Sequence, residues 1–248
     1  MSLASLPMYD RPELRGAHDR YWRAIRAELG EGPEYLTRAG DVWDHWLSPD
    51  LLLSQTCGYP FRAHLHGKVT LVGTPDHGIA GCPPGHYCSV FVARAEDARA
   101  SPEDFAKARF AYNEALSQSG WAAPQALARS EGFAFRNLVE TGGHAASARA
   151  VAEGRADIAA LDALSWRLMR RHDRFAAALK EVGRTPPTPA LPYITARTRP
   201  ARPLFDAIEA AIEALAPEDR AALSLEGLVP IPAADYIAVP TPPPPDEI

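Results

Sequence analysis

The sequence has no excess of positive charge. Its 26 Lys and Arg residues are outnumbered by 31 Asp and Glu residues, and the formal net charge is -5 at pH 7. Proteins that bind nucleic acid through its backbone need clustered Lys and Arg to displace the phosphate counterions. Nucleic acid is therefore not an expected partner, and any anion that this chain binds must be held by a few local groups.

Long apolar runs are also missing. No stretch reaches the roughly 18 apolar residues that mark a membrane-spanning helix, so membrane insertion is not expected. Residues 1–10 lack the basic segment, apolar run and small-residue cleavage site of a secretory signal. As written, the chain is expected to be cytoplasmic, or periplasmic if its true start lies upstream.

Cysteine is scarce. Cys57, Cys82 and Cys88 make an odd number, so at least one thiol is expected to be free unless it pairs with another chain. Cys82 and Cys88 flank the turn 83–85, and the sequence leaves open whether they form a disulfide. A zinc site that uses His86 is not expected, because there is no second cysteine pair.

Familiar catalytic motifs are absent as well. The sequence contains no Gly-x-Ser-x-Gly, no Gly-Lys-Ser/Thr phosphate loop, no His-Glu-x-x-His and no Gly-x-Gly-x-x-Gly. Cys57 with His144 would suit a nucleophile and base, but nothing in the sequence places them together. We therefore expect no catalytic residues, no cofactor and no metal, and we do not expect an enzyme.

The sequence does contain a repeated alternation of strand and helix patterns. Its 248 residues exceed the usual size of one core but are few for two independent domains, and 46% of them are apolar. Periodicity predicts strands at 3–7, 51–55, 69–73, 87–93, 109–112, 135–140, 157–161 and 193–195, and helices at 11–29, 41–47, 102–108, up to 127, 145–153 and 203–215.

The order of these elements predicts two α/β lobes. Lobe 1 is expected to contain residues 1–93 and 194–248, and lobe 2 residues 94–193, each with a mostly parallel sheet flanked by helices. Crossings near 92–95 and 191–197 are expected to form a two-stranded hinge. The Pro-rich tail 240–248 is expected to be an extended strap or a disordered end.

The polar loop that follows the predicted strand 109–112 is the sharpest candidate for a binding site. It contains Asn113, Ser117, Gln118, Ser119 and Gly120, and a helix begins within it. Unpaired backbone N–H groups, the helix dipole and hydroxyl groups converge at such a point, which favours anion binding. The competing interpretation is that Ser117 or Ser119 only caps the helix.

Two further strand ends add candidates in the second half. The segment 141–147 again follows a strand and opens a helix, and its two glycines allow close backbone approach to a ligand that His144 would contact. Asp162 ends a strand, where ligands of open α/β sheets bind. Asp157, before that strand, is expected to cap or to make a turn.

The first half of the sequence also contains candidate binding residues. Thr56 and Tyr59 follow the apolar strand 51–55, and Tyr9 follows the first strand. Their hydroxyl groups are therefore expected to face the ligand from the other lobe.

The ordered set of these motifs resembles the phosphate, phosphite and phosphonate substrate-binding proteins of ABC transporters. The matching segments are Ser117-Gln118-Ser119-Gly120, Thr141-Gly142-Gly143-His144 and the strand that ends at Asp162. The resemblance implies a type-2 periplasmic-binding-protein fold that closes over a small oxyanion. It departs from the family in having Gln118 in place of a threonine, in lacking an export signal and in being shorter.

The resemblance implies a small anionic ligand and, as a partner, an ABC transporter permease. Three roles stay open at this point: a binding protein for transport, a cytoplasmic ligand sensor with a protein partner, and an enzyme on the same scaffold related to thiamine-pyrimidine metabolism.

Overall fold

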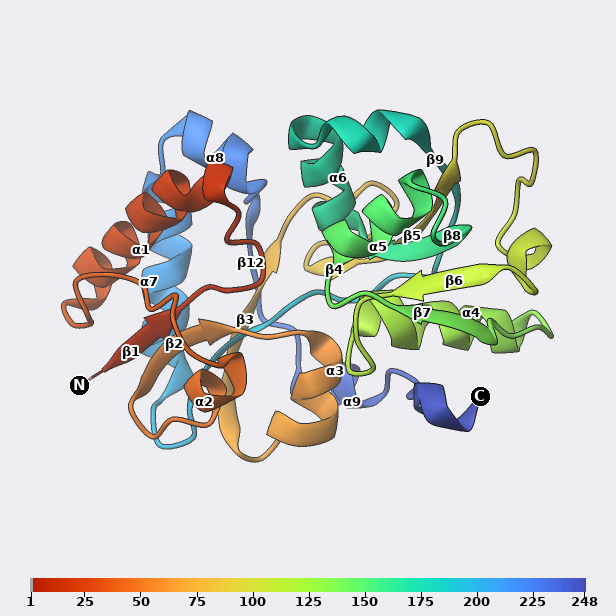
Figure 1. The fold of residues 1–248 in the computed structure, drawn as a ribbon. Helices are drawn as coiled ribbons and strands as arrows, with labels where there is room; N and C mark the ends of the chain where they lie inside the picture. Colours follow the sequence, from red (N-terminus) through yellow and green to blue (C-terminus); the bar gives the residue numbers. More distant parts are fainter. Residues whose placement is uncertain (1) are drawn as a thin grey trace. The chain divides into compact units, whose positions relative to one another are not determined.

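The computed structural model describes residues 2–248, which form two compact α/β units (Figure 1). Unit 1 comprises the chain up to His86 together with Pro189–Ala238, and unit 2 comprises Tyr87–Thr188 together with Val239–Ile248. The predicted division into two α/β lobes is confirmed, whereas the expected boundaries at 93/94 and 193/194 differ by several residues from those observed.

The chain passes between the units three times, after His86, after Thr188 and after Ala238. The first two passages pair with each other as a two-stranded sheet, β4 (His86–Tyr87) with β10 (Thr188–Pro189). This pair takes the place of the hinge strands that we expected farther along the chain.

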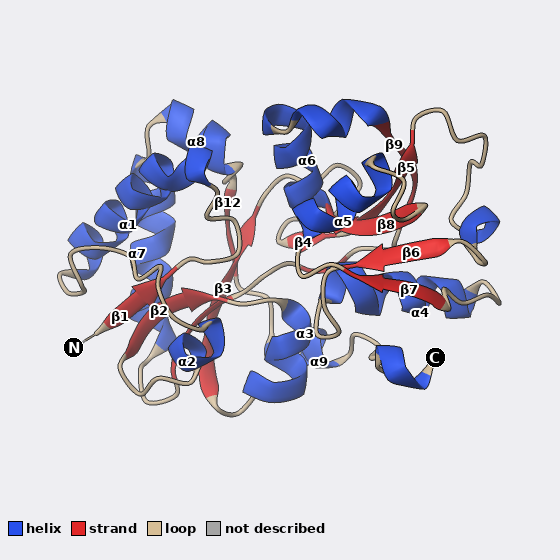
Figure 2. Ribbon diagram, in the orientation of Figure 1, coloured by secondary structure: helices blue, strands red, loops and turns tan. Residues whose placement is uncertain are grey.

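Unit 1 is a five-stranded sheet with helices on both faces (Figure 2), and its strand order is β1-β2-β11-β3-β12. Its elements are β1 (Leu3–Ser5), η1 (Pro12–Leu14), α1 (Arg15–Leu29), α2 (Val42–Trp46), β2 (Leu51–Gln55), α3 (Gly58–Pro60), η2 (Phe61–Leu65), β3 (Val69–Asp76), β11 (Tyr193–Ala196), α7 (Ala201–Ala214), α8 (Pro217–Leu223), β12 (Gly227–Val229) and α9 (Ala233–Ile237).

Local sequence explains the main elements of unit 1. Every residue of β2 is buried, as expected for a strand with an apolar run that has a neighbour on each side in the sheet. Helix α1 buries Tyr21, Trp22 and Ile25 on one face, and it ends where Gly30 adopts a φ of 73° that suits glycine. Helices α1 and α7 pack together on one side of the sheet, and α2 and α9 lie on the other (Figure 1).

Unit 2 is a second five-stranded sheet with the order β7-β6-β8-β5-β9. Its elements are β5 (Ser89–Arg94), η3 (Glu103–Phe105), β6 (Arg109–Tyr112), η4 (Gln118–Ala122), α4 (Ala123–Ser130), β7 (Asn137–Glu140), α5 (His144–Ala152), β8 (Ile158–Asp162), α6 (Ala163–His172), η5 (Arg174–Ala178), β9 (Leu179–Arg184) and η6 (Pro245–Glu247).

Strand β5 is the reason that the first boundary was predicted too late. It pairs antiparallel with β8 and with β9, so it lies inside the sheet of unit 2 rather than at the end of lobe 1. Its buried Phe91 lies beside Phe135, whose ring stacks on Phe110 with centroids 4.4 Å apart. This strand therefore contributes directly to the core of unit 2.

Both sheets are mixed, which corrects the expectation of mostly parallel sheets. In unit 1, β1 and β2 are parallel, while β11 and β12 run antiparallel to their neighbours. In unit 2, β6 is parallel to both β7 and β8. The parallel strands are those that precede the candidate site loops, because helical crossovers connect them.

The C-terminal tail belongs to unit 2, although we assigned it to lobe 1. The indole nitrogen of Trp121 donates a hydrogen bond of 3.1 Å to the carbonyl oxygen of Pro243, and residues 245–247 form the short helix η6. The tail is thus an extended strap on this unit, since its prolines cannot pair as a strand.

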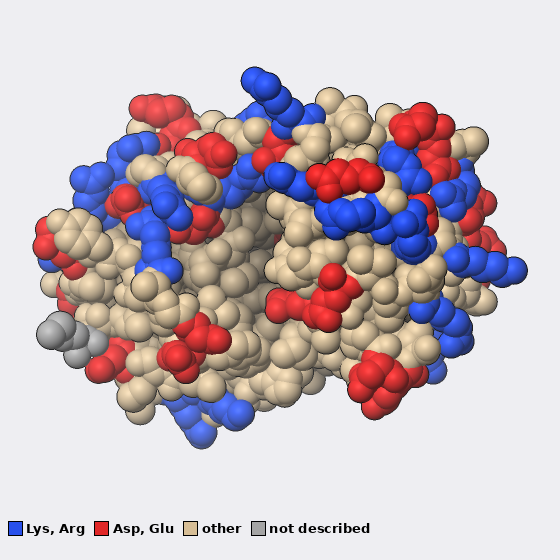
Figure 3. Space-filling view, in the orientation of Figure 1, with Lys and Arg blue, Asp and Glu red and all other residues tan. Residues whose placement is uncertain are grey.

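Acidic and basic side chains are interspersed on the face shown in Figure 3. None of the three cysteines forms a disulfide, so the Cys82–Cys88 bridge is absent. Within residues 2–248, no helix has the length and apolar character to span a bilayer, and no cluster of His, Cys, Asp and Glu is arranged to hold a metal ion.

Candidate functional site

The loop after β6 leads directly into helix η4, and a serine caps the start of this helix. The Oγ of Ser117 accepts a hydrogen bond of 2.9 Å from the backbone N–H of Gly120. The capping interpretation therefore holds for Ser117, whose lone pair satisfies one of the otherwise unpaired N–H groups at the start of the helix. Ser119 is not the cap, and its hydroxyl has a different partner.

Ser119 joins the two loops that the sequence singled out. Its Oγ lies 3.0 Å from the Nε2 of His144, the first residue of α5. These residues are 25 positions apart in the chain, and they meet because β6 and β7 are adjacent parallel strands whose carboxyl ends lie at the same edge. The structure thus brings the 117–120 turn and residue 144 together.

The ring of His144 is neutral at pH 7. Burial lowers the pKa of His144 from its ordinary value of 6.5 to about 4, and a backbone hydrogen bond with Ala160 opposes this shift only in part. A neutral imidazole has one nitrogen that donates and one that accepts. His144 therefore contributes hydrogen bonding rather than charge to the site.

Thr141 connects the loop after β7, residues 141–144, to the end of β6 through hydrogen bonds. Its backbone N–H and its Oγ1 both donate to the carbonyl oxygen of Tyr112, at 3.0 and 2.9 Å, and the N–H of Gly142 donates to the carbonyl oxygen of Asn113 at 2.8 Å. We did not predict this role for Thr141. Its place in the segment Thr141-Gly142-Gly143-His144, directly after a strand, was the available signal.

Asn113 packs against the glycine of the first loop. A Cβ atom at Gly120 would overlap the side-chain oxygen of Asn113, and it would lie 3.2 Å from the Oγ of Ser117. Glycine is therefore favoured at position 120 by the close approach of Asn113 and not by an unusual φ. Gln118, beside it, is buried with 2% of its surface exposed.

Helix α5 begins without a side-chain cap. Gly143 precedes it in an extended conformation and makes no side-chain cap hydrogen bond. The N–H groups at such a helix start, together with the helix dipole, attract an anion. The site in unit 2 thus combines two helix starts, two serine hydroxyls and one neutral histidine.

Asp162 caps a helix, whereas Asp157 does not cap or make a turn as expected. The Oδ1 of Asp162 caps helix α6 by accepting from the N–H of Ser165 at 2.7 Å. Asp157 does not cap but pairs with Arg94 and Arg109 at 3.1 and 3.0 Å. These guanidinium groups hold the pKa of Asp157 far below its ordinary value.

The candidates in unit 1 also follow strands of their sheet. Tyr9 packs edge-on against His77 with ring centroids 5.4 Å apart. Thr56 is buried after β2, and its backbone N–H donates to the carbonyl oxygen of Pro192 at 3.1 Å. Tyr59 lies in α3 with the guanidinium of Arg62 above its ring, 4.4 Å from the centroid.

Several solved proteins share this fold. PhnD1 from Prochlorococcus marinus, solved with methylphosphonate, is 15% identical with a TM-score of 0.75, and the match covers 95% of this chain and 94% of that one. A binding protein component of an ABC phosphonate transporter from Pseudomonas aeruginosa is 16% identical with a TM-score of 0.71, covering 92% and 80%. At such identities the likeness concerns the fold, and it confirms the predicted two-lobed class.

A match to a family model supports family membership as well as a shared fold. No curated protein matches this chain in sequence, but the model described as "ABC transporter, phosphonate, periplasmic substrate-binding protein" matches residues 50–236. That range covers most of both units and includes the Ser117–Gly120 and Thr141–His144 segments, so it confirms the resemblance predicted from the motifs. The chain belongs to the family of phosphonate substrate-binding proteins of ABC transporters.

Proposed function

We propose that this protein binds a small oxyanion of the phosphonate or phosphate class and does not transform it. The observation that carries the proposal is the hydrogen bond of 3.0 Å between Ser119 and His144. It joins two helix starts at one sheet edge, where N–H groups, hydroxyls and a neutral imidazole suit several oxygens of one anion.

Each group has a specific part in this proposal. The N–H groups at the starts of η4 and α5 donate to the oxyanion, and the hydroxyls of Ser117 and Ser119 add further donors. His144 stays neutral, so it donates or accepts without competing for the ligand's proton. Asn113, Gln118 and Gly120 shape the first loop, while Asp162 supports α6 through its cap.

We extend the proposal to Tyr9, Thr56 and Tyr59 as the contribution of unit 1 to ligand binding. Their hydroxyl groups follow strands or lie in short helices directly after them, as the serines of unit 2 do. Phenylalanine substitutions at Tyr9 and Tyr59 remove one hydroxyl each and leave the ring packing in place. Weaker ligand binding by either variant supports the extension, and unchanged binding by both contradicts it.

Family membership supports a transport role. The family description names an ABC transporter and the periplasm, so we propose a periplasmic protein that delivers its ligand to a permease. The comparisons do not favour the thiamine-related enzyme, and they give no support to a cytoplasmic partner.

Isothermal titration calorimetry with phosphate, phosphite, sulfate, methylphosphonate and ethylphosphonate tests the proposal. We expect at least one of these anions to bind with micromolar or tighter affinity, and we expect the ligand to be recovered unchanged afterwards. The absence of heat for every member of this panel contradicts the proposed function.

A further inference from the structure

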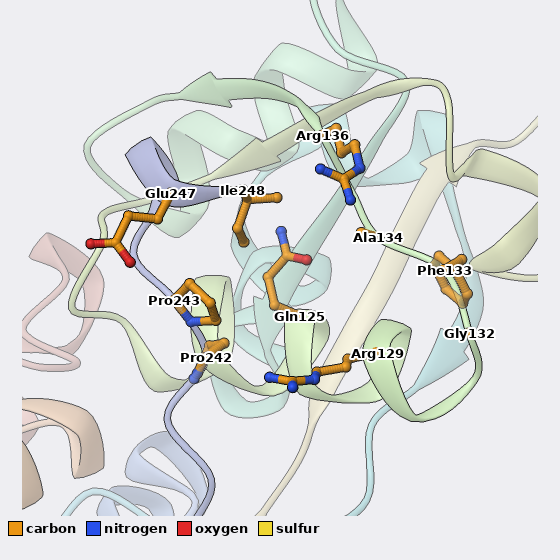
Figure 4. A pocket seen from close by; sticks show the side chains of 10 residues that line it. All are labelled: Gln125, Arg129, Gly132, Phe133, Ala134, Arg136, Pro242, Pro243, Glu247 and Ile248. Carbon is orange, nitrogen blue, oxygen red and sulfur yellow. The ribbon is translucent and has the colours of Figure 1, made fainter.

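A large cavity lies in unit 2, away from the candidate site. Its volume is about 670 Å³, it is open to solvent on one side, and it is lined by helix α4, the segment 132–136 and the C-terminal tail (Figure 4). It shares no residue with the Ser117–Gly120 loop or with His144. Its volume is within the range of about 300 to 1,000 Å³ that is usual for small-molecule sites.

Two arginines face this cavity. Figure 4 shows the guanidinium groups of Arg129 and Arg136 pointing into it from opposite sides. Among residues 2–248, no carboxylate forms an ion pair with either of them. Glu247 is the acidic side chain in the lining, and its carboxylate points away from both guanidinium groups in Figure 4.

Interaction with a helix dipole explains the position of only one of these arginines. Arg129 lies in the last turn of α4, where a cation interacts favourably with the helix dipole. Arg136 precedes β7 and lies at no helix end. An anion between two guanidinium groups that face one cavity can form a charge-assisted hydrogen bond with each of them.

Part of the remaining lining is apolar, and hydrogen bonds hold two of its walls in place. Phe133, Pro243 and Ile248 provide apolar surface. The tail wall is fixed by the hydrogen bond of 3.1 Å from the indole of Trp121 to Pro243. The side chain of Gln125 is only 3% exposed, and its Nε2 donates to the carbonyl oxygen of Phe135 at 3.0 Å.

From this lining we propose that the cavity is a second binding site, for an organic anion with an apolar body. Its carboxylate, or a group of similar charge, binds between Arg129 and Arg136, because guanidinium groups recognise planar oxyanions with paired donors. Its apolar body packs against Phe133 and the tail. A small inorganic anion fills too little of the cavity to use these walls.

A matched pair of probes tests this site by isothermal titration calorimetry. The probes are 1-naphthaleneacetate and its uncharged isostere 1-naphthaleneacetamide. We expect the anion to bind one site per chain and the amide to bind at least about tenfold more weakly, as the loss of a charged hydrogen-bond acceptor implies. Equal binding of both probes, or no binding of the anion at millimolar concentration, overturns the proposal.

Substitutions identify the site. The double variant R129Q/R136Q is expected to lose at least about tenfold in affinity for 1-naphthaleneacetate while it keeps the wild-type affinity for methylphosphonate. S119A is expected to bind 1-naphthaleneacetate as wild type does. Both arginines are exposed, and the single variant R136Q serves if the double variant fails to fold. Unchanged affinity in R136Q and R129Q/R136Q shows that the probe binds elsewhere and overturns the assignment.

Discussion

Ser119 has two uses for one hydroxyl group: it contacts His144 at 3.0 Å, and in the proposed function it also faces the anion. Substitution S119A removes a donor that a charged ligand would leave unpaired, so methylphosphonate binding should weaken by about 10- to 100-fold. Calorimetric titration measures this loss. S130A is the control, because Ser130 donates to Leu127 on the far turn of the same helical segment. Equal losses in both variants contradict a role in binding.

Gly120 is constrained by its neighbour rather than by its own backbone. In G120A the new methyl group overlaps the side chain of Asn113, and overpacking of this kind costs about 1 to 3 kcal/mol in the free energy of unfolding. Chemical denaturation measures this change in the free energy of unfolding. The double variant N113A/G120A removes the overlapping atoms and should recover most of the loss. No recovery would falsify the view that Asn113 determines the residue at position 120.

His144 makes stability depend on pH in a defined window. Its pKa is lowered to about 4 in the folded protein, against 6.5 ordinarily, so the unfolded chain binds the proton more tightly. Stability from this group is complete above about pH 6.5 and is lost as the pH falls towards about 4. The difference in unfolding free energy between wild type and H144Q should change by up to about 3 kcal/mol across that window. Parallel curves of unfolding free energy against pH for wild type and H144Q would contradict this prediction.

At the scale of elements, Asp157 ties three strands of unit 2 together. It precedes β8 and accepts from the backbone N–H of Arg109 in β6 and from the guanidinium groups of Arg94 and Arg109. D157N should destabilise unit 2 by about 1 to 3 kcal/mol, because it strands charged donors. Urea denaturation compares it with E131Q, which changes an exposed carboxylate in the same unit. Similar midpoints for both variants argue against this linkage.

The pKa of Asp157 predicts how this contribution depends on pH. Because the folded-state pKa is lowered by the two arginines, the stabilisation is present above the ordinary pKa of an aspartate and is lost as the pH falls below it. This window lies below that of His144, so the two effects are separable in one acid titration.

At the scale of the whole molecule, ligand binding should stabilise the fold by mass action. A ligand at about 100 times its dissociation constant adds about 2.7 kcal/mol, which corresponds to a rise in Tm of about 5 to 10 °C for a chain of this length. Differential scanning calorimetry with methylphosphonate measures it, with S119A as the matched control at the same ligand concentration. An unchanged Tm at a concentration that saturates binding is incompatible with binding to the native state alone.

Local patterns in the sequence predicted much of the fold. The strands 51–55 and 109–112 were predicted with the observed bounds, and the helix predicted at 145–153 is observed at His144–Ala152. Helix α6 was missed, although Asp162 caps it and Leu164 and Leu168 are spaced for one buried face. Signals of this kind depend on neighbours a few residues apart, so they can be read without the fold.

The sequence by itself determined where the anion loops occur, because serine caps, glycines and strand ends are local features. Only the tertiary structure decided that Ser119 meets His144, that β5 completes the sheet of unit 2 and that the tail packs against Trp121. It also decided that Asp162 caps a helix while Asp157 pairs with arginines. These outcomes depend on which distant segments share a sheet edge or a core, and the local pattern of residues does not contain that information.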